Sequence, residues 1–349
     1  MRIAQVAPLF EAVPPKLYGG TERVVSNLTE ELVALGHDVT LFASGDSVTA
    51  ATLNPMLPRA IRLDPDMRDW IAAYMRMLEL VYRRASEFDV LHFHIDYFPF
   101  SLFKRQRTPF VTTLHGRLDL PEFGPTYGLF PDVPVVSISD SQRAPLPRLD
   151  WIGTVLHGIP AKLLTPQPVK QDYLAFLGRI SPEKGIDKAI RIAAASGMKL
   201  KVAAKVDKAD QAYYEQHVRP LLEQGHVEFV GEIDDARKPA FLSGAHALLF
   251  PIDWPEPFGL VMIEAMACGT PVIAFNRGSV PEVIDEGVSG LIVEDEAAAV
   301  AAVGRLDALD RGRVRRQFEQ RFTARRMAED YVEVYEALCA APKLRAVGD

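Results

Sequence analysis

Hydrophobic and polar positions along the chain follow two alternating patterns. Residues 2–8, RIAQVAP, form a short apolar run typical of a buried strand, and Val24, Leu28 and Leu32 then recur at helical spacing on one face. Residues 38–44, DVTLFAS, return to the strand pattern. The order strand, helix, strand therefore opens the chain. Further strands are expected in the first half at 89–95, 110–116 and 133–139.

The same order starts again at Tyr173. Residues 173–180 indicate a strand, 182–197 a helix that ends at Gly197, and 198–205 the next strand. Apolar strands that alternate with helices are typical of parallel sheets covered by helices on both faces, so the sequence predicts an α/β fold. Later strands in this half are expected at 226–233, 246–252, 270–275 and 290–293.

The length of 349 residues favours two domains, because a single hydrophobic core seldom grows to that size. Residues 157–172, HGIPAKLLTPQPVKQD, contain prolines and no periodic pattern, so we expect a linker there. The first domain is then residues 1–165 and the second 171–322. The helical segment from about 323 to 349 is long enough to return to the first domain.

Composition removes several classes of protein. The net charge is −7 and no basic face is evident, so nucleic acid is not expected as a partner. Cys268 and Cys339 are the only cysteines, which suggests neither a disulfide framework nor a cysteine zinc site and suits the cytoplasm. No signal peptide or membrane-spanning run is predicted. Residues 69–88 form an amphipathic helix that we interpret as solvated surface, with peripheral membrane contact as the alternative.

Three loops at predicted strand ends look suited to an anion. In the first, Tyr18 precedes Gly19 and Gly20 at the start of a helix, although a tight turn explains those glycines equally well. In the second, GRISPEKG, Arg179 and Lys184 stand where two cations could bind a diphosphate. The alternative for both is an ordinary solvated charge.

The third loop and its helix, PEPFGLVMIEAMACGTPVIAF, hold two carboxylates in apolar surroundings. Glu256 precedes the helix, and Gly259, Leu260 and Val261 supply free amides at its first turn. Glu264 lies over a turn deeper, and a carboxylate accepts hydrogen bonds well from vicinal hydroxyls. The order carboxylate, amides, carboxylate matches sugar, diphosphate and ribose, so we expect a nucleotide-sugar. Alternatively, Glu256 favours the helix start by its charge and Glu264 pairs with a basic neighbour.

Histidines lie near strand ends in the first half. His92, His94 and Asp96 could begin a metal site, but no further ligands complete it, so structural roles or contacts with an acceptor are preferred. His115 ends an apolar strand, where a catalytic group would face a ligand. The absence of G-x-G-x-x-G after the first strand of either half argues against a dinucleotide oxidoreductase.

Taken together, E-P-F-G-L-V-M-I-E, G-T-P-V-I-A, G-R-I-S-P-E-K-G and the N-terminal G-G-T-E resemble the retaining GT-B glycosyltransferases of family 4. The resemblance extends over nearly the whole chain. It implies two Rossmann-like domains with parallel sheets facing across a cleft, and a C-terminal helix that crosses back to the first domain. One departure is His157, which stands where the family often has Asn.

The resemblance also implies roles for individual residues. Glu256 and the amides after Phe258 would hold the donor sugar and diphosphate, with Glu264 on the ribose and backbone near Ile233 on the base. Arg179 and Lys184 would neutralise the diphosphate, Gly19 and Gly20 would approach it from the other domain, and His115 would lie by the reacting carbon. Tyr18, His94 and Asp96 are expected on the acceptor side. Gly19, Gly20, Arg179, Lys184 and the residues from Glu256 to Glu264 lie within the motifs quoted above.

The resulting expectation is a retaining, metal-independent hexosyltransferase. The donor would be a nucleotide-diphosphate sugar, UDP-glucose as first choice, and the acceptor a hydroxyl of a small molecule, lipid or saccharide. No cofactor is expected. The alternatives are a nucleotide-sugar epimerase of the same fold and a non-catalytic protein that binds sugar nucleotides.

Overall fold

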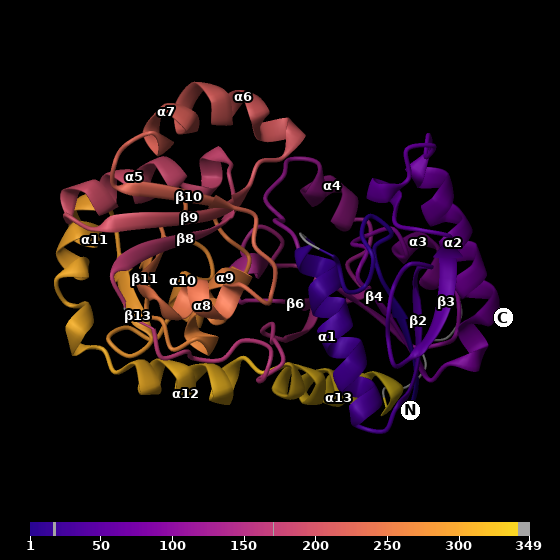
Figure 1. Cartoon of the computed structure of the whole chain (residues 1–349). Coiled ribbons are helices and arrows are strands. Elements are labelled where there is room, and N and C mark those ends of the chain that lie inside the picture. Colours follow the sequence, from indigo (N-terminus) through magenta and orange to yellow (C-terminus); the bar gives the residue numbers. More distant parts are fainter. Residues whose placement is uncertain (17–18, 170, 341–349) are drawn as a thin grey trace. The chain divides into compact units, whose positions relative to one another are not determined.

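The computed structural model describes residues 1–16, 19–169 and 171–340, and the chain divides into two compact units. The first consists of residues 1–158 together with the C-terminal segment that begins at Ala324, and the second of residues 159–323 (Figure 1). Each unit has its own parallel sheet and its own hydrophobic core.

The first unit is built on a seven-stranded sheet with the order β3-β2-β1-β4-β5-β6-β7, in which every pairing is parallel. Its four central strands are buried because they are packed on both faces. The strands are β1 (Arg2–Val6), β2 (Asp38–Ser44), β3 (Thr52–Leu57), β4 (Val90–Phe93), β5 (Phe110–Thr113), β6 (Pro134–Ser137) and β7 (Asp150–Thr154).

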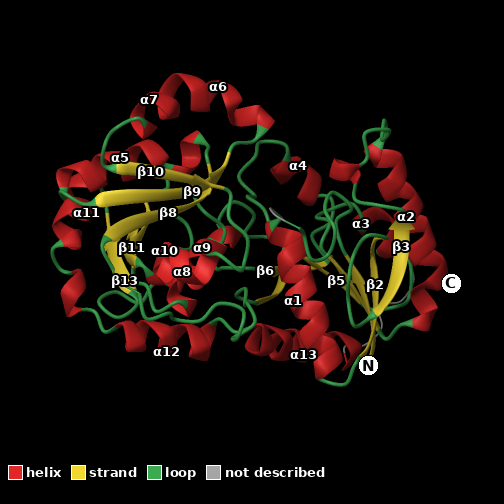
Figure 2. Cartoon of the chain, in the orientation of Figure 1, coloured by secondary structure: helices red, strands yellow, loops and turns green. Residues whose placement is uncertain are grey.

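Helices pack against this sheet (Figure 2). Helix α1 contacts β2, and α13 contacts both α1 and β4, while α2 contacts β3 and α3. Helix α2 begins after Asp69, whose side chain accepts hydrogen bonds from the backbone N–H groups of Ile71 and Ala72. The helices are α1 (Gly20–Ala34), α2 (Trp70–Arg84), α3 (Phe100–Phe103), α4 (Phe123–Tyr127) and α13 (Ala324–Ala340). Among the residues described, no helix is both long and apolar enough to cross a membrane.

The second unit has a six-stranded parallel sheet with the order β10-β9-β8-β11-β12-β13. Helices α5 and α11 contact each other and lie against β8, β9, β12 and β13, and α8 and α9 contact β11. The strands are β8 (Tyr173–Arg179), β9 (Lys199–Lys205), β10 (Val227–Gly231), β11 (Ala245–Phe250), β12 (Val272–Phe275) and β13 (Gly290–Val293). The helices are α5 (Ile186–Ala195), α6 (Gln211–Tyr213), α7 (Arg219–Leu222), α8 (Lys238–Ser243), α9 (Leu260–Ala267), α10 (Val280–Val283), α11 (Glu296–Val303) and α12 (Arg311–Arg321).

Both sheets reverse their strand order once. The reversal lies between β1 and β4 in the first unit and between β8 and β11 in the second. In open parallel sheets a ligand binds beyond the carboxyl ends of the strands at this switch point. The topology therefore indicates one candidate position in each unit.

The predicted α/β architecture with two parallel sheets is confirmed. The segment expected to be a linker, however, lies largely within the second unit. Residues 159–164 belong to the second unit, so the first unit ends at Gly158 and not at 165. Ile159 pairs with Thr323 and its N–H donates to the carbonyl of Phe322, and the Arg315 guanidinium donates to the carbonyl of Leu164. Ile159 and Leu164 are both buried, although the prolines in this segment had suggested an exposed linker.

Candidate functional site

In the second unit, the loops that follow the two strands at the switch point are joined by hydrogen bonds. Strand β8 ends at Arg179, and Lys184 closes the short helix η4 (Pro182–Lys184) in the loop after it. The loop after β11 carries Asp253, whose N–H donates to the carbonyl of Glu183 at 2.9 Å. Gly185 has a φ of 69°, and a Cβ there would collide with the Pro251 carbonyl. The backbone thus brings both predicted motifs to one place.

Lys184 and Glu256 form an ion pair in this place. The Lys184 ammonium lies 2.5 Å from Oε2 of Glu256, and Nε1 of Trp254 donates to the same oxygen at 2.9 Å. The Lys184 Nζ atom also lies 5.0 Å from the centre of the Trp254 ring. Two residues predicted separately for the donor site are therefore partners of each other.

Arg179 is held by carboxylates on two sides. Its Nη2 atom lies 2.6 Å from Oε1 of Glu183, and its Nε atom lies 3.6 Å from Oδ2 of Asp210. The side chain is about one-third exposed. Arg179 is thus at the carboxyl end of β8, as predicted, with its charge already compensated.

The loop before helix α9 is fixed by a serine and two glycines. The Ser279 hydroxyl donates to the Phe258 carbonyl at 2.9 Å, and the Ser279 N–H donates to the Glu256 carbonyl at 2.9 Å. Gly278 has a φ of 56°, and a Cβ there would lie against the backbone of Glu256. Gly259 has a φ of 81° and precedes the first turn of α9, which Leu260 and Val261 begin. The predicted amides therefore begin at Gly259, three residues after Glu256.

Glu264 is buried on α9 and has a basic partner. Its Oε1 atom lies 2.6 Å from the Lys238 ammonium, which also lies 3.2 Å from Oδ1 of Asp235. Lys238 is the first residue of α8. This pairing was the alternative expected for Glu264, and it occupies one of the two carboxylate oxygens. Ile233, predicted near the base, is a buried residue just after β10.

In the first unit, the predicted glycines stand at the start of α1, which follows β1. Gly20 is the first helical residue, and Gly19 precedes it with its carbonyl accepting from the Arg23 N–H at 3.1 Å. A Cβ on Gly19 would approach Pro15 to 2.8 Å, so the chain is tightly packed there. Tyr18, predicted on the acceptor side, lies outside the described residues.

Four histidines of the first unit, His92, His94, His115 and His157, form one cluster at the switch point. His94 lies 2.9 Å from His115, between Nδ1 of the former and Nε2 of the latter, and Nε2 of His94 lies 2.7 Å from Oε1 of Gln5. His157 stacks on His115 with ring centres 5.2 Å apart and planes at 21°. Burial lowers the pKa of His115 to about 3 and lowers the pKa values of His92, His94 and His157 well below 6.5. The four rings are therefore neutral at physiological pH.

These contacts change what can be expected of His94. The residue is 3% exposed and both of its ring nitrogens are hydrogen-bonded within the unit. A direct bond from His94 to an acceptor would break one of these two, so the structure gives the residue an internal role. Asp96, by contrast, is only half-buried and has the strained φ of 49°, and burial raises the pKa of its carboxyl to about 6.

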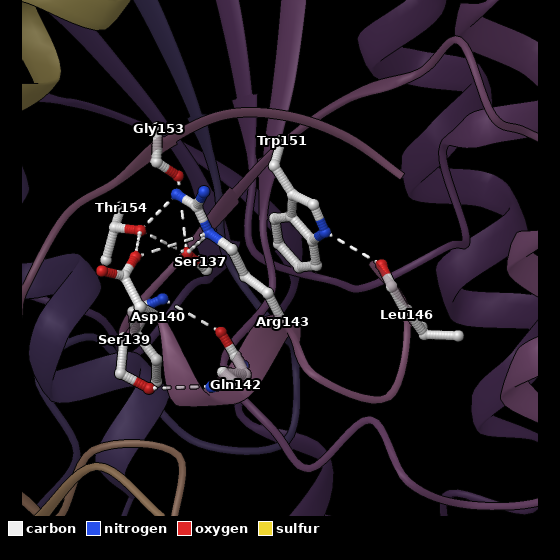
Figure 3. A network of polar contacts seen from close by, with 10 residues as sticks. Ser137, Ser139, Asp140, Gln142, Arg143, Leu146, Trp151, Gly153 and Thr154 are labelled. Atoms are coloured by element: carbon white, nitrogen blue, oxygen red, sulfur yellow. Dashed lines mark hydrogen bonds and ion pairs between the residues drawn. The ribbon is translucent and has the colours of Figure 1, made fainter. Parts of the chain in front are cut away.

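A polar network beyond β6 and β7 supports the turn that carries His115. The Gln142 amide donates to the carbonyls of Leu114 and Gly116, both at 2.8 Å, and its oxygen accepts from the Ile138 N–H at 3.0 Å. Figure 3 shows Gln142 next to Arg143, whose guanidinium lies between Ser137 and Thr154 with Trp151 beside it. Gln142 thus holds the main chain on both sides of His115.

Several residues at these positions are absent from the sequence prediction. Trp254 and Gly278 lie close to predicted motifs. Trp254 could have been noticed as an aromatic residue in a loop, and Gly278 as a loop glycine. Lys238, Gln142 and Gln5 lie in segments with an ordinary helix, turn or strand pattern, and no local signal indicates their partners. In the part of the chain that the structure describes, no group of three or more histidine, cysteine, aspartate or glutamate side chains is placed to hold a metal ion.

Two family models match the chain in consecutive segments. Residues 18–153 match the model described as Glycosyltransferase Family 4, and residues 165–325 match the model described as Glycosyl transferases group 1. Among curated proteins, the chain is 28% identical to the phosphatidyl-myo-inositol mannosyltransferase of Mycolicibacterium smegmatis, over 98% of this chain and 95% of that protein.

Solved glycosyltransferases share the fold over nearly its full length. AviGT4, a glycosyltransferase involved in avilamycin A biosynthesis, is 25% identical with a TM-score of 0.76, covering 99% of both chains. HepE of Anabaena, solved in complex with UDP-glucose, has a TM-score of 0.73 over 97% of this chain and 100% of that one. At 16% identity the likeness to HepE is one of fold alone.

Proposed function

Because the chain belongs to the GT-B glycosyltransferases of group 1 and family 4 and is thus an enzyme that transfers sugars, we propose that it is a retaining, metal-independent hexosyltransferase that uses UDP-glucose. The acceptor group is a hydroxyl. The choice of UDP-glucose follows the family resemblance and the UDP-glucose complex of HepE, whereas the mannosyltransferase relative makes a mannose donor the first competitor.

The observation that carries the proposal is the joining of Lys184, Glu256 and the start of α9 at the switch point of the second sheet. A helix N-terminus and an ammonium both favour a diphosphate, and a carboxylate favours sugar hydroxyls. Arg179, at the neighbouring strand end, adds a second cation. These are the groups that a nucleotide-sugar requires, and they lie within one unit.

Donor binding must then exchange partners at the ion pair of Lys184 and Glu256. Glu256 accepts from Lys184, and Oε1 of Glu264 accepts from Lys238. We expect the diphosphate to draw Lys184 from Glu256, which frees that carboxylate for hydroxyls of the sugar. The ribose hydroxyls would donate to Oε2 of Glu264 while Lys238 keeps Oε1 in place.

Transfer itself requires stabilisation of negative charge on the leaving group. The bond between sugar and phosphate breaks toward an oxocarbenium-like centre, and the nucleoside diphosphate leaves as an anion. Arg179, Lys184 and the amides of Gly259 and Leu260 would stabilise that anion. Retention is ascribed, as in the family, to attack of the acceptor hydroxyl on the face that the diphosphate leaves, so neither glutamate needs to act as a nucleophile. His115 would then lie beside the reacting carbon.

The first unit suggests the kind of acceptor. Tyr97 and Phe98, which follow Asp96, stack with ring centres 5.4 Å apart, and Phe123 lies 6.1 Å from Tyr97. All three rings are half-buried. An aromatic surface beside a single carboxylate favours a neutral or aromatic acceptor whose hydroxyl donates to Asp96. Small molecules, lipids and saccharides that meet this description are the acceptors to screen.

The test begins with the melting temperature of the purified protein in the presence of UDP, GDP, ADP and their common sugars. A ligand that binds only the folded state raises the melting temperature, because it adds to the free energy of unfolding. The gain is about 2.7 kcal/mol when the ligand concentration is about a hundred times the dissociation constant. We expect UDP and UDP-glucose to give the largest shift and Glu264→Ala to reduce it. No shift with any nucleotide would mean that both glutamates are structural.

Turnover then separates an enzyme from a protein that only binds. Release of UDP from UDP-glucose with an acceptor mixture should persist in the presence of a chelator, because the proposed charge stabilisation comes from side chains and amides. Loss of activity that Mg²⁺ or Mn²⁺ restores would overturn the metal-independent mechanism. Binding without transfer or hydrolysis would favour the non-catalytic alternative.

A further inference from the structure

A closed polar network lies at the switch point of the first sheet and ends at His115. Gln5 is at its centre: it lies on β1, is fully buried, and uses both ends of its amide. Its Nε2 donates to the hydroxyl of Tyr335 at 3.0 Å, and its Oε1 faces Nε2 of His94 at 2.7 Å. The network therefore joins β1 to the strand ends of β4 and β5 and to helix α13.

The direction of each hydrogen bond follows from the amide of Gln5. An amide oxygen only accepts, so Nε2 of His94 carries the hydrogen. A neutral imidazole has one N–H, so Nδ1 of His94 is bare and accepts from Nε2 of His115 at 2.9 Å. The hydrogen of His115 is then on Nε2. Its Nδ1 carries an unshared electron pair, is buried, and has no hydrogen-bond partner among the described residues.

The second branch of the network runs in a matching direction. The Tyr335 hydroxyl accepts from Gln5 and lies 2.7 Å from Nδ1 of His92, to which it can donate. Nε2 of His92 then donates to the Thr113 hydroxyl at 2.7 Å, which lies 2.8 Å from the Tyr331 hydroxyl. Every bond in this branch is satisfied within the unit. By contrast, the unshared electron pair on Nδ1 of His115 accepts no hydrogen bond from the described residues.

We propose that Gln5, acting through His94, fixes His115 in the Nε2–H tautomer and so keeps Nδ1 of His115 as a hydrogen-bond acceptor for a substrate hydroxyl. The choice of a hydroxyl rests on the proposed sugar transfer. Nδ1 is buried, so we expect substrate binding to move the side chains that cover it. Gln5 and His94 are positioning residues here, and Gln142 complements them by holding the backbone on both sides of His115.

This arrangement suits orientation better than proton removal. Burial lowers the pKa of His115 to about 3, so the ring holds no proton at neutral pH and is a weak base. A weak base with a fixed lone pair can align a hydroxyl without taking its proton. The proton released on transfer must therefore leave by another group, in agreement with assistance by the donor phosphate.

The tautomers can be measured directly on the full chain labelled with ¹⁵N-histidine. Correlation spectra that connect ring nitrogens to ring carbon-bound hydrogens distinguish Nε2–H from Nδ1–H, and His94→Gln and His115→Gln assign the signals. We expect both His94 and His115 to be Nε2–H in the wild-type protein between pH 6 and 8. An Nδ1–H form of His115, or an even mixture, would overturn the proposal without any need for turnover.

Gln5→Met tests the relay, because methionine has a similar length and makes neither hydrogen bond. We expect a mixture of His115 tautomers and a kcat lower by about tenfold, similar to the loss of an outer partner of a functional histidine. Thr113→Val is the matched control, since it breaks the His92 branch in the same buried network. It should keep the Nε2–H form of His115 and most of kcat.

The outcomes separate the relay from the function. If Gln5→Met leaves both the tautomer and kcat unchanged, the relay is wrong while sugar transfer stands. If the wild-type protein neither binds nor turns over a nucleotide-sugar, the proposed function fails, but the tautomer spectrum still tests the relay. If Gln5→Met does not fold, the wild-type spectrum alone supports or refutes the assignment.

Discussion

Lys184 is the residue on which the proposed chemistry depends most directly, since it is a half-buried cation paired with Glu256. Its side chain is 20% exposed, the same fraction as that of Lys188, which lies four residues further along the chain. Lys188 pairs with Asp253. The two lysines thus have the same exposure and each has a carboxylate partner, but Glu256 is 10% exposed whereas Asp253 is 59% exposed. Only Lys184 pairs with a carboxylate of the loop that leads into α9, because its partner is Glu256.

Lys184→Ala should lower kcat by about a hundredfold, because one group that stabilises charge on the leaving diphosphate is lost. Lys188→Ala should change kcat by less than about threefold, since an exposed ion pair contributes little. Steady-state turnover of UDP-glucose measures both. Equal losses in the two variants would show that the effect comes from the loop and not from charge at the diphosphate.

At the level of elements, the donor site depends on how closely two loops approach. The loop before α10 passes against the backbone of Glu256. Only glycine fits at position 278, because a Cβ there would collide with that backbone. Gly287 lies in a later loop with a similar φ of 74°, but nothing lies within 4 Å of the Cβ it would gain. The two positions therefore separate backbone strain from the clash at Glu256.

Gly278→Ala should lower both the stability of the protein and its affinity for UDP, because the new methyl group displaces the Glu256 loop. Gly287→Ala should cost only the strain of a positive φ, about 1–2 kcal/mol, and leave UDP affinity unchanged. Urea unfolding and calorimetric titration with UDP give the two quantities. Unchanged UDP affinity in Gly278→Ala would argue that the position of Glu256 does not matter for the nucleotide.

Across the whole molecule, buried histidines link stability to pH. The pKa values of His92, His94, His115 and His157 are lowered by burial, so the unfolded chain binds protons below about pH 6.5 while the folded protein does not. Their contribution is fully present above pH 6.5 and is lost as pH falls toward 3. The raised pKa of Asp96, about 6, acts in the opposite sense because its folded form binds the proton first.

The melting temperature should therefore fall steadily between pH 6.5 and 5. Each buried histidine contributes a slope of about 1.4 kcal/mol per pH unit, offset in part by Asp96. His157→Asn, which restores the residue common in the family, should reduce the slope by about that amount. A stability that does not change over this range would mean that the histidines are protonated in the folded protein.

Much of the fold followed from the sequence because apolar strands and helices alternate with the periods that parallel α/β sheets require. Two strands were missed, β3 and β7, and both lie at the edges of the first sheet. An edge strand is partly exposed, and β3 contains Pro55, so neither has the continuous apolar pattern of a central strand. The family was likewise readable, because its motifs are local.

The partners within the site were decided by tertiary structure. Lys184 and Glu256 are 72 residues apart, and Gln5 is 89 residues from His94, so no spacing in the chain could indicate these contacts. The sequence by itself determined which residue types stand at the carboxyl ends of the strands, because those positions follow from periodicity. Folding alone determined which of them meet, and hence which charges are paired and which nitrogen of His115 is bare, because both depend on distances that only the packed sheet creates.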